Sequence, residues 1–295
     1  MDECSLISYL SIGLYLEPLL HPKPGAVTLF KSHRDKNIKD FMLHASIAQT
    51  ALFKACHASR AGYNPLVVGL RSYRSDLSSL GLKKNIALGS MLLLLPLATA
   101  LSASKNDLSL ETLCSKAREF VMKYDGEEVA KEYYLVLELL RPSHLGSYEG
   151  PIPGVGSGKH PESLTSVLEI AKWDIVHREL LEGYPIALKT AFKLNIEGLK
   201  RRVLLKTLLE LLASEGDTLI AAKYGWIAYK KALAEARLAL WLSQKVGVLR
   251  TLRWLDSLWR PRGWSPGAVL DVLATAIGLA WLFRATSSLR TRNVL

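Results

Sequence analysis

The sequence has few of the patterns that build β-sheets or zinc centres. Across its 295 residues, runs of alternating Val, Ile and Thr bounded by turns do not occur, whereas apolar residues recur at helical spacing almost throughout. The three cysteines, Cys4, Cys56 and Cys114, are far apart and lack metal-ligand spacing. We therefore expect buried or free thiols of a reducing compartment. The seven histidines show no His-Glu-x-x-His or comparable zinc pattern.

Uninterrupted apolar runs long enough to span a membrane are also absent. The segment 88–103 contains Pro96 and is short for a span, and the segment 268–285 carries Asp271 and Arg284. Both segments fit buried core helices better than membrane spans. No charged leader region and no small-residue cleavage site marks the N-terminus. We expect a cytoplasmic protein without a transmembrane segment.

Acidic residues are outnumbered, and the formal net charge of +11 indicates an anionic partner such as a nucleotide, a nucleic acid or a membrane surface. Much of the excess is scattered or lies in the C-terminal third, as at 200–202 and 290–292. No run of five or six basic residues occurs, and basic residues do not alternate with aromatic ones. This pattern favours a solvated basic surface over nucleic-acid binding. Glutamine occurs only at Gln49 and Gln244, which hints at a thermophilic source.

Helical spacing predicts a single all-α domain over residues 1–295, a bundle of about ten or more helices. One irregular segment, 142–161, holds five glycines and four prolines and lies between two helical halves. Loops of this length are usually functional or disordered. A homo-oligomer is compatible with the sequence. The predicted helices cover residues 2–20, 38–60, 84–104, 108–123, 127–141, 163–181, 184–213, 217–223, 226–246 and 266–288.

The most charge-rich turn of the chain lies between Glu17 and Asp35. The Pro-Lys-Pro-Gly sequence at 22–25 forbids a helix and stiffens the backbone, and Gly25 permits a close approach or a positive φ. Glu17 lies on the apolar stripe of the first helix, where a carboxylate either pairs inside the fold or lines a cavity. We expect a rigid polar loop beside a cavity.

Further acidic residues fall on or next to apolar helical faces. Each has a structural explanation: Asp174 as a helix pair with Arg178, Asp217 as an N-cap, and Asp271 as a charge near a helix N-terminus. The alternative is a shared polar pocket that also includes Glu17 and Asp35. Carboxylates gathered inside a helical bundle usually hold a divalent metal or a cationic substrate.

The segment 154–160, Gly-Val-Gly-Ser-Gly-Lys-His, superficially resembles a phosphate-binding loop. Pro153 stands where that motif needs a glycine, no Ser or Thr follows Lys159, and no strand precedes the segment. A P-loop is therefore not predicted, and a flexible lid is the alternative function for this segment.

Six short motifs, in one order and spanning nearly the full chain, resemble those of the triphosphoribosyl-dephospho-CoA synthase family. They are Pro22-Lys23-Pro24-Gly25 with His33-x-Asp35, Lys84-Asn85 before an apolar helix, Asp125 with Arg141-Pro142, Trp173-Asp174 with Gly183-Tyr184, Asp217 with Lys223-Tyr224-Gly225, and Ser265-Pro266-Gly267 with Asp271.

This resemblance implies an all-α transferase. The 2′-hydroxyl of 3′-dephospho-CoA, or of a related coenzyme-like acceptor, attacks the ribose C1′ of the substrate ATP, and adenine leaves. The product is the prosthetic-group precursor of citrate lyase or malonate decarboxylase acyl carrier proteins. Such a site needs cations for the triphosphate, a base for the hydroxyl proton, and negative charge beside an oxocarbenium-like carbon.

Site roles follow from the resemblance combined with residue chemistry. The residues expected to act in catalysis are Glu17, His33, Asp35 and Asp174. Those expected to bind nucleotide or phosphate are Lys23, Gly25, Asn85, Lys223 and Gly267. Those expected to hold Mg²⁺ are Asp35, Asp174 and Asp271.

The sequence departs from the family pattern in two places. The Asn-rich turn of the family becomes Lys-Lys-Asn-Ile-Ala at 83–87, without its glycine, and Ala26, Thr28 and Leu29 replace polar residues after the Pro-Lys-Pro-Gly turn. Two alternatives stay open at this point. One is a non-catalytic helical protein that binds a nucleotide or polyanion, and the other is a basic protein that binds nucleic acid or a membrane surface.

Overall fold

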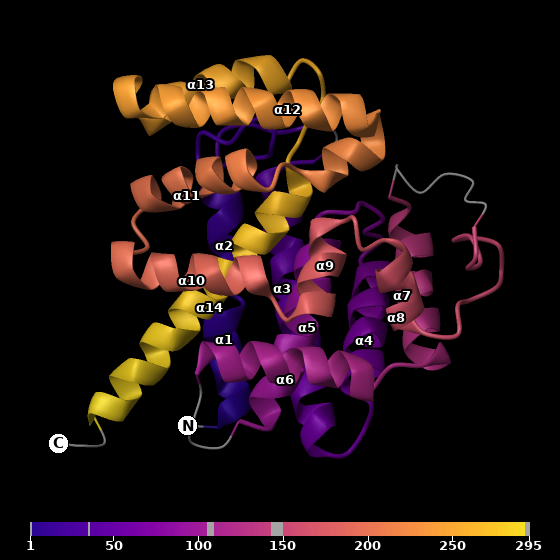
Figure 1. Cartoon of the computed structure of the whole chain (residues 1–295). Coiled ribbons are helices and arrows are strands. Elements are labelled where there is room, and N and C mark those ends of the chain that lie inside the picture. The colour runs from indigo at the N-terminus through magenta and orange to yellow at the C-terminus, as the bar shows by residue number, and fades with distance from the viewer. Residues whose placement is uncertain (1, 35, 105–108, 143–149, 293–295) are drawn as a thin grey trace.

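The computed structural model describes residues 2–34, 36–104, 109–142 and 150–292, and these residues contain no β-sheet. The all-α prediction is confirmed (Figure 1). The elements are η1 (Glu3–Leu6), α1 (Ile7–Leu10), α2 (Ile12–Leu19), α3 (Ile38–Arg60), α4 (Pro65–Ser79), α5 (Leu88–Ser102), α6 (Leu110–Lys123), α7 (Glu127–Leu140), α8 (Leu164–Ile170), α9 (Ile175–Glu182), α10 (Pro185–Glu197), α11 (Arg201–Ser214), α12 (Thr218–Val246), α13 (Val248–Trp259) and α14 (Gly267–Arg292).

The predicted helix boundaries hold best where capping signals are strong. Asn37 caps α3 through a capping box with Asp40, which fixes its start as predicted. The predicted helix 184–213 is wrong as a single element, because Gly198, at φ +96°, separates α10 from α11. Helix α4 was not predicted, although Asn64 before Pro65 is a regular helix start.

Helix α14 crosses the molecule against α1 and α2 with nearly touching backbones. A Cβ at Gly13 would lie 1.8 Å from the carbonyl oxygen of Ala274, and one at Gly278 would lie 2.0 Å from that of Leu10. Only glycine fits at these two crossings, so α14 lies deep enough to reach the centre of the fold. It also packs along α10 and α5.

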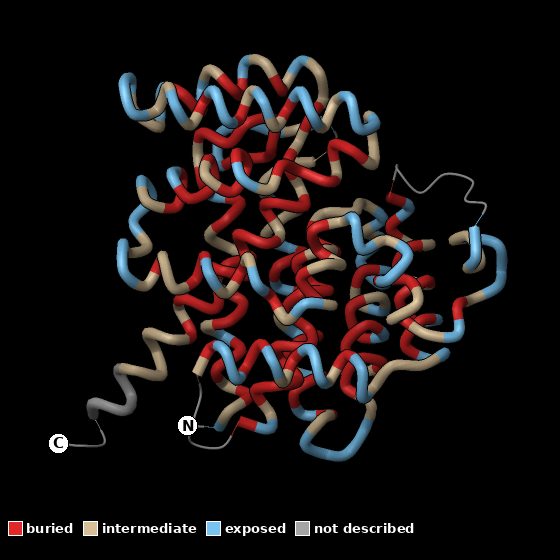
Figure 2. The backbone as a smooth tube through the Cα atoms, in the orientation of Figure 1, coloured by how far each residue is buried: buried red, intermediate tan, exposed pale blue. Residues whose placement is uncertain are grey.

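The two apolar segments of the sequence are buried core helices, as predicted. Nearly every residue of α5 is buried, as the red tube in Figure 2 shows for the interior. Within the described residues, one helical segment, Gly267–Ser287, is long and apolar enough to span a membrane. Inside this fold, however, 72% of that segment is buried against other helices.

The cysteine prediction is wrong for two of the three residues. Cys4 in η1 and Cys56 in α3 form a disulfide, with their Cα atoms 5.8 Å apart. They are separated by 52 positions, so only the packing of η1 on α3 brings them together. Cys114 is a buried free thiol, as predicted.

Candidate active site

A cavity of about 620 Å³ opens between the N-terminal turn, the starts of α5, α9 and α14, and the side of α7. This volume is that of a typical small-molecule or cofactor site. Eight of the predicted site residues line it, although they come from distant parts of the sequence. They are Glu17, Lys23, His33, Asn85, Asp174, Lys223, Gly267 and Asp271.

Two further candidates, Gly25 and Asp125, lie outside the cavity lining, and a third is not placed. Asp35 lies outside the described residues. Gly25, at φ +62°, is absent from the cavity lining, and a Cβ there would lie 1.7 Å from the carbonyl oxygen of Trp264. It therefore docks the turn against the segment before α14. Asp125 lies elsewhere too, because its carboxylate accepts the Leu164 N–H at 2.7 Å and caps α8.

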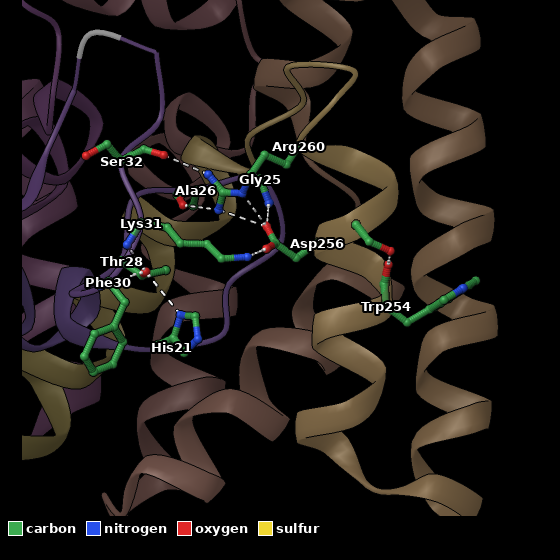
Figure 3. Close-up of polar contacts among 11 residues, drawn as sticks. His21, Gly25, Ala26, Thr28, Phe30, Lys31, Ser32, Trp254, Asp256 and Arg260 are labelled. Carbon is green, nitrogen blue, oxygen red and sulfur yellow. Dashed lines mark hydrogen bonds and ion pairs between the residues drawn. The ribbon is translucent and has the colours of Figure 1, made fainter.

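The N-terminal turn is fastened to α13 by residues that the sequence did not single out. Asp256 accepts the Gly25 N–H at 2.8 Å and the Lys31 amine at 2.7 Å (Figure 3). Arg260 donates to the carbonyl oxygens of Ala26 (2.8 Å) and Ser32 (2.9 Å). Burial alone would raise the pKa of Asp256, but these bonds outweigh burial and lower its pKa. The turn is rigid because its backbone is held at several points.

Glu17 and Lys23 form an ion pair in the cavity wall. Both side chains are buried, the Lys23 amine donates to the Glu17 carboxylate, and it also donates to the Glu17 carbonyl oxygen at 3.0 Å. Burial raises the pKa of Glu17 and lowers that of Lys23, while their mutual attraction opposes both shifts. The structure meets both expectations for Glu17, because the side chain pairs inside the fold and also lines the cavity.

Three helices begin beside the cavity and share two capping carboxylates. Asp174 caps α9 through the Val176 N–H (2.8 Å) and accepts the hydroxyl of Thr218, the first residue of α12 (3.0 Å). Asp217 caps α12 (3.2 Å) and also accepts the Val269 N–H in the first turn of α14 (2.8 Å). Burial raises the pKa of Asp217 to about 7, against its backbone bonds. The positive ends of three helix dipoles therefore meet here.

One predicted pairing is corrected by this arrangement. Asp174 does not lie within a helix and does not pair with Arg178, because the predicted helix 163–181 is broken into α8 and α9 just before it. Arg178 pairs with Glu215 instead, at 3.1 Å. The predicted N-cap role of Asp217 is confirmed, and its second bond to α14 was not predicted.

Asp271 belongs to α14, and its carboxyl group lies against the start of α5. Its Oδ1 accepts the Ser90 hydroxyl at 2.5 Å, and its Oδ2 lies where a Cβ of Gly89 would otherwise be, at 2.3 Å. Burial raises its pKa to about 8, an increase that the Ser90 bond opposes and that nearby Glu17 reinforces. At neutral pH this carboxyl is therefore mainly protonated, and it can donate a proton into the cavity.

Cations surround the other side of the cavity. Lys36 donates to the Asn85 carbonyl oxygen, and Arg34 donates to the Tyr224 hydroxyl at 2.6 Å. His33 lies among these cations. Burial is the main reason that its pKa is lowered to about 4, and the positive charges of Arg34, Lys36 and Lys223 lower it further. His33 is thus neutral at pH 7 and can accept a proton.

Within the described residues, the carboxylates of the cavity do not form a ready-made metal cage. One group of three residues has potential donor atoms within 4.8 Å of one another, namely Asp2, Cys4 and His57, but it lies outside the cavity and the Cys4 sulfur is bonded to Cys56. Mg²⁺ in nucleotide sites usually takes one or two carboxylates together with phosphate oxygens and water. Asp174 fits an ion that arrives with a nucleotide, whereas Asp271, protonated at neutral pH, would have to lose its proton to bind one.

Two features of the cavity had only weak sequence signals. His177 lines it, and its buried Nδ1 has no hydrogen-bond partner within the described structure. The segment 152–155 lines it as well, from the irregular region predicted to be a lid. Pro153 is held there, since its carbonyl oxygen accepts the Tyr134 hydroxyl at 2.8 Å.

Comparison with known proteins agrees with this geometry. The family model of ATP:dephospho-CoA triphosphoribosyl transferases (CitG) matches residues 5–289. The chain belongs to this family. Its members transfer the triphosphoribosyl group of ATP to dephospho-CoA, so the chain is a transferase of this type, and the resemblance seen in the sequence is confirmed.

A solved structure with the same fold is a crystal structure from Archaeoglobus fulgidus provisionally assigned as a triphosphoribosyl-dephospho-coA synthase. Its TM-score is 0.57 and its sequence identity is 19%. The match covers 82% of this chain and 97% of that chain. At this identity the likeness supports the fold alone. No curated protein matches the chain.

Proposed function

We propose that the cavity holds ATP with its triphosphate among Arg34, Lys36 and Lys223 and its ribose toward Asp174 and Asp271. The observation that carries this proposal is the division of charge in one cavity, with cations around His33 and carboxylates at the helix starts. A triphosphate needs several cations, and the carbon that loses adenine needs nearby negative charge.

His33 receives the proton of the acceptor hydroxyl. As the 2′-oxygen of dephospho-CoA forms its bond to C1′, the bond from C1′ to adenine breaks, and the hydroxyl proton moves to the neutral imidazole. Burial and nearby cations together hold the pKa of His33 near 4, and phosphates bound to Arg34, Lys36 and Lys223 neutralise three of these cations. The pKa of His33 therefore rises when ATP binds, which makes it a stronger base in the complex than in the free enzyme.

Asp271 supplies the proton that adenine needs as it departs. Its raised pKa of about 8 keeps it protonated, and Ser90 holds it in place at the start of α5. The pair of one acid and one base with displaced pKa values is a common arrangement for proton transfer at neutral pH.

Magnesium belongs in this proposal as the companion of ATP. The phosphates would hold it, with Asp174 as a protein ligand, and it would neutralise phosphate charge. Lys23 is assigned a supporting role, because its amine is already bound to Glu17, and the pair stiffens the wall next to the ribose.

The pKa of His33 is the direct test. An NMR titration of the His33 ring protons, assigned with the variant His33→Gln, should show a pKa rise of about 1 unit or more with saturating Mg-ATP. His33→Gln should keep Mg-ATP affinity and lose about 100-fold or more in turnover. A His33 pKa that stays the same with bound Mg-ATP would contradict the proposed phosphate position.

A further inference from the structure

The outer face of the α12–α13 hairpin is both apolar and basic, and the transfer reaction uses none of it. In Figure 1 these two helices form the outermost layer at the top, and Figure 2 shows their outer side largely exposed. We call this surface the hairpin face. Its exposed large apolar side chains are Trp226, Ile227, Leu238, Trp241, Val246 and Leu249.

The apolar residues follow one line on the surface. Exposed residues recur at three- and four-residue steps along α12, namely Ile227, Lys231, Ala234, Leu238, Trp241 and Lys245. Ile227 is 87% exposed and Trp241 is 51% exposed. Val246 and Leu249 lie on either side of Gly247, where the chain turns into α13. The line therefore ends in an apolar tip.

The hairpin face is strongly positively charged. Residues 226–253 contain six basic residues and one acidic residue, Glu235. Glu235 is turned inward, where it accepts Trp259 Nε1 at 2.9 Å and Arg262 at 2.8 Å. All six basic residues are exposed and form no ion pair within the described part of the chain: Lys230, Lys231, Arg237, Lys245, Arg250 and Arg253. The Lys245 amine lies 4.3 Å from the centre of the Trp241 ring.

We infer that the hairpin face docks on an anionic lipid bilayer. Interfacial helices of this kind place Trp, Leu and Ile at the boundary of the acyl chains, while Lys and Arg beside them reach the headgroups. Each basic residue near an anionic membrane adds roughly fivefold to the partition coefficient. The hairpin face has both components in one surface.

Charge and shape argue against the other occupants. A second copy of the chain, placed on this face symmetrically, would set exposed cations opposite cations with no exposed acidic residue to pair them. A nucleic-acid backbone would pair with the cations, but it would leave Ile227, Leu238 and Val246 against water. An anionic bilayer satisfies both the charged and the apolar side chains.

The test is co-sedimentation of the full chain with vesicles of phosphatidylcholine alone or of phosphatidylcholine mixed with phosphatidylglycerol. We expect binding to the mixed vesicles about tenfold or more above binding to phosphatidylcholine, with a blue shift of tryptophan emission. Ile227→Ser with Trp241→Ser should weaken binding about tenfold or more, and Lys231→Glu about fivefold or more. Adenine-release activity should be unchanged, which shows that these variants are folded.

The chain offers matched controls. Ile196 on α10 is also 87% exposed, and Lys131 on α7 is also exposed, so Ile196→Ser and Lys131→Glu should leave vesicle binding unchanged. Equal binding to both kinds of vesicle, or none, would overturn the inference. Salt-sensitive binding to a DNA duplex without vesicle binding would overturn it in favour of nucleic acid. A dimer in sedimentation equilibrium that Ile227→Arg dissociates would overturn it in favour of self-association.

Discussion

A methyl group at Gly89 would lie 2.3 Å from Oδ2 of Asp271, so the glycine at the start of α5 makes room for this carboxyl group. Gly89→Ala should push Asp271 away from Ser90 and into the cavity. A displacement of about 1 Å at a reacting group can cost on the order of 100-fold in rate. We predict a loss of this size in adenine release, while crowding costs about 1–3 kcal/mol of stability.

The control is the same Gly89→Ala substitution in a protein that lacks the Asp271 carboxyl group. In an Asp271→Ala background the added methyl group meets no carboxylate, so Gly89→Ala should change the free energy of unfolding little. Equal costs in the two backgrounds would show that Gly89 and Asp271 are not coupled.

The contribution of Asp271 to the stability of the unliganded protein should fall as the pH rises from about 4 to about 8. Burial raises the pKa of Asp271 from its usual 3.8 to about 8, so in this window the folded protein binds a proton that the unfolded chain has released. The stabilisation is full below pH 4 and is lost once the pH passes the folded-state pKa. Asp217, raised to about 7, contributes with the same sign.

Asp271→Asn should flatten this dependence. Because the group lines the cavity and is only half-buried, we expect the change to be about 1–3 kcal/mol between pH 5 and pH 9. Urea unfolding at the two pH values measures it in wild type and variant. Parallel pH curves would show that Asp271 titrates at its ordinary pKa.

Breaking the buried Glu17–Lys23 pair should destabilise the fold strongly. Lys23→Met leaves the Glu17 carboxylate buried without its partner, which typically costs about 3–5 kcal/mol. Lys23→Met combined with Glu17→Gln should recover part of this loss, because no charge is then left unpaired. Urea unfolding of both singles and the double variant measures the coupling, and a Lys23→Met protein as stable as wild type contradicts it.

Lys223 should matter for nucleotide binding. Lys223→Met removes one of the cations proposed to hold the triphosphate, and charge-assisted bonds are worth about 1.5–3 kcal/mol, so Mg-ATP affinity should fall about tenfold or more. Titration calorimetry measures this affinity. The matched control is Lys131→Met, which changes an exposed lysine of α7. Unchanged affinity in Lys223→Met would show that the triphosphate does not bind at Lys223.

The sequence predicted the helical fold and eight residues of the cavity wall, because apolar spacing and short motifs act locally. Glu17, His33, Asp174, Lys223 and Asp271 were candidates from their own neighbourhoods, and they do line one cavity. Their roles stay predictions.

Contacts between distant segments could not be predicted. The bond from Asp256 to Gly25 joins positions 231 residues apart, and nothing near Asp256 in the sequence indicates it. The Cys4–Cys56 disulfide and the second cap formed by Asp217 are of the same kind. The break before Asp174 was missed because apolar spacing continues across it, so that a capping residue was taken for a residue inside a helix.

The most direct measurement is adenine release from Mg-ATP with and without dephospho-CoA. The account predicts one adenine per triphosphoribosylated acceptor, no release without dephospho-CoA, and a loss of about 100-fold or more in His33→Gln. Adenine release that is absent, that is independent of the acceptor, or that survives in full in His33→Gln would contradict it.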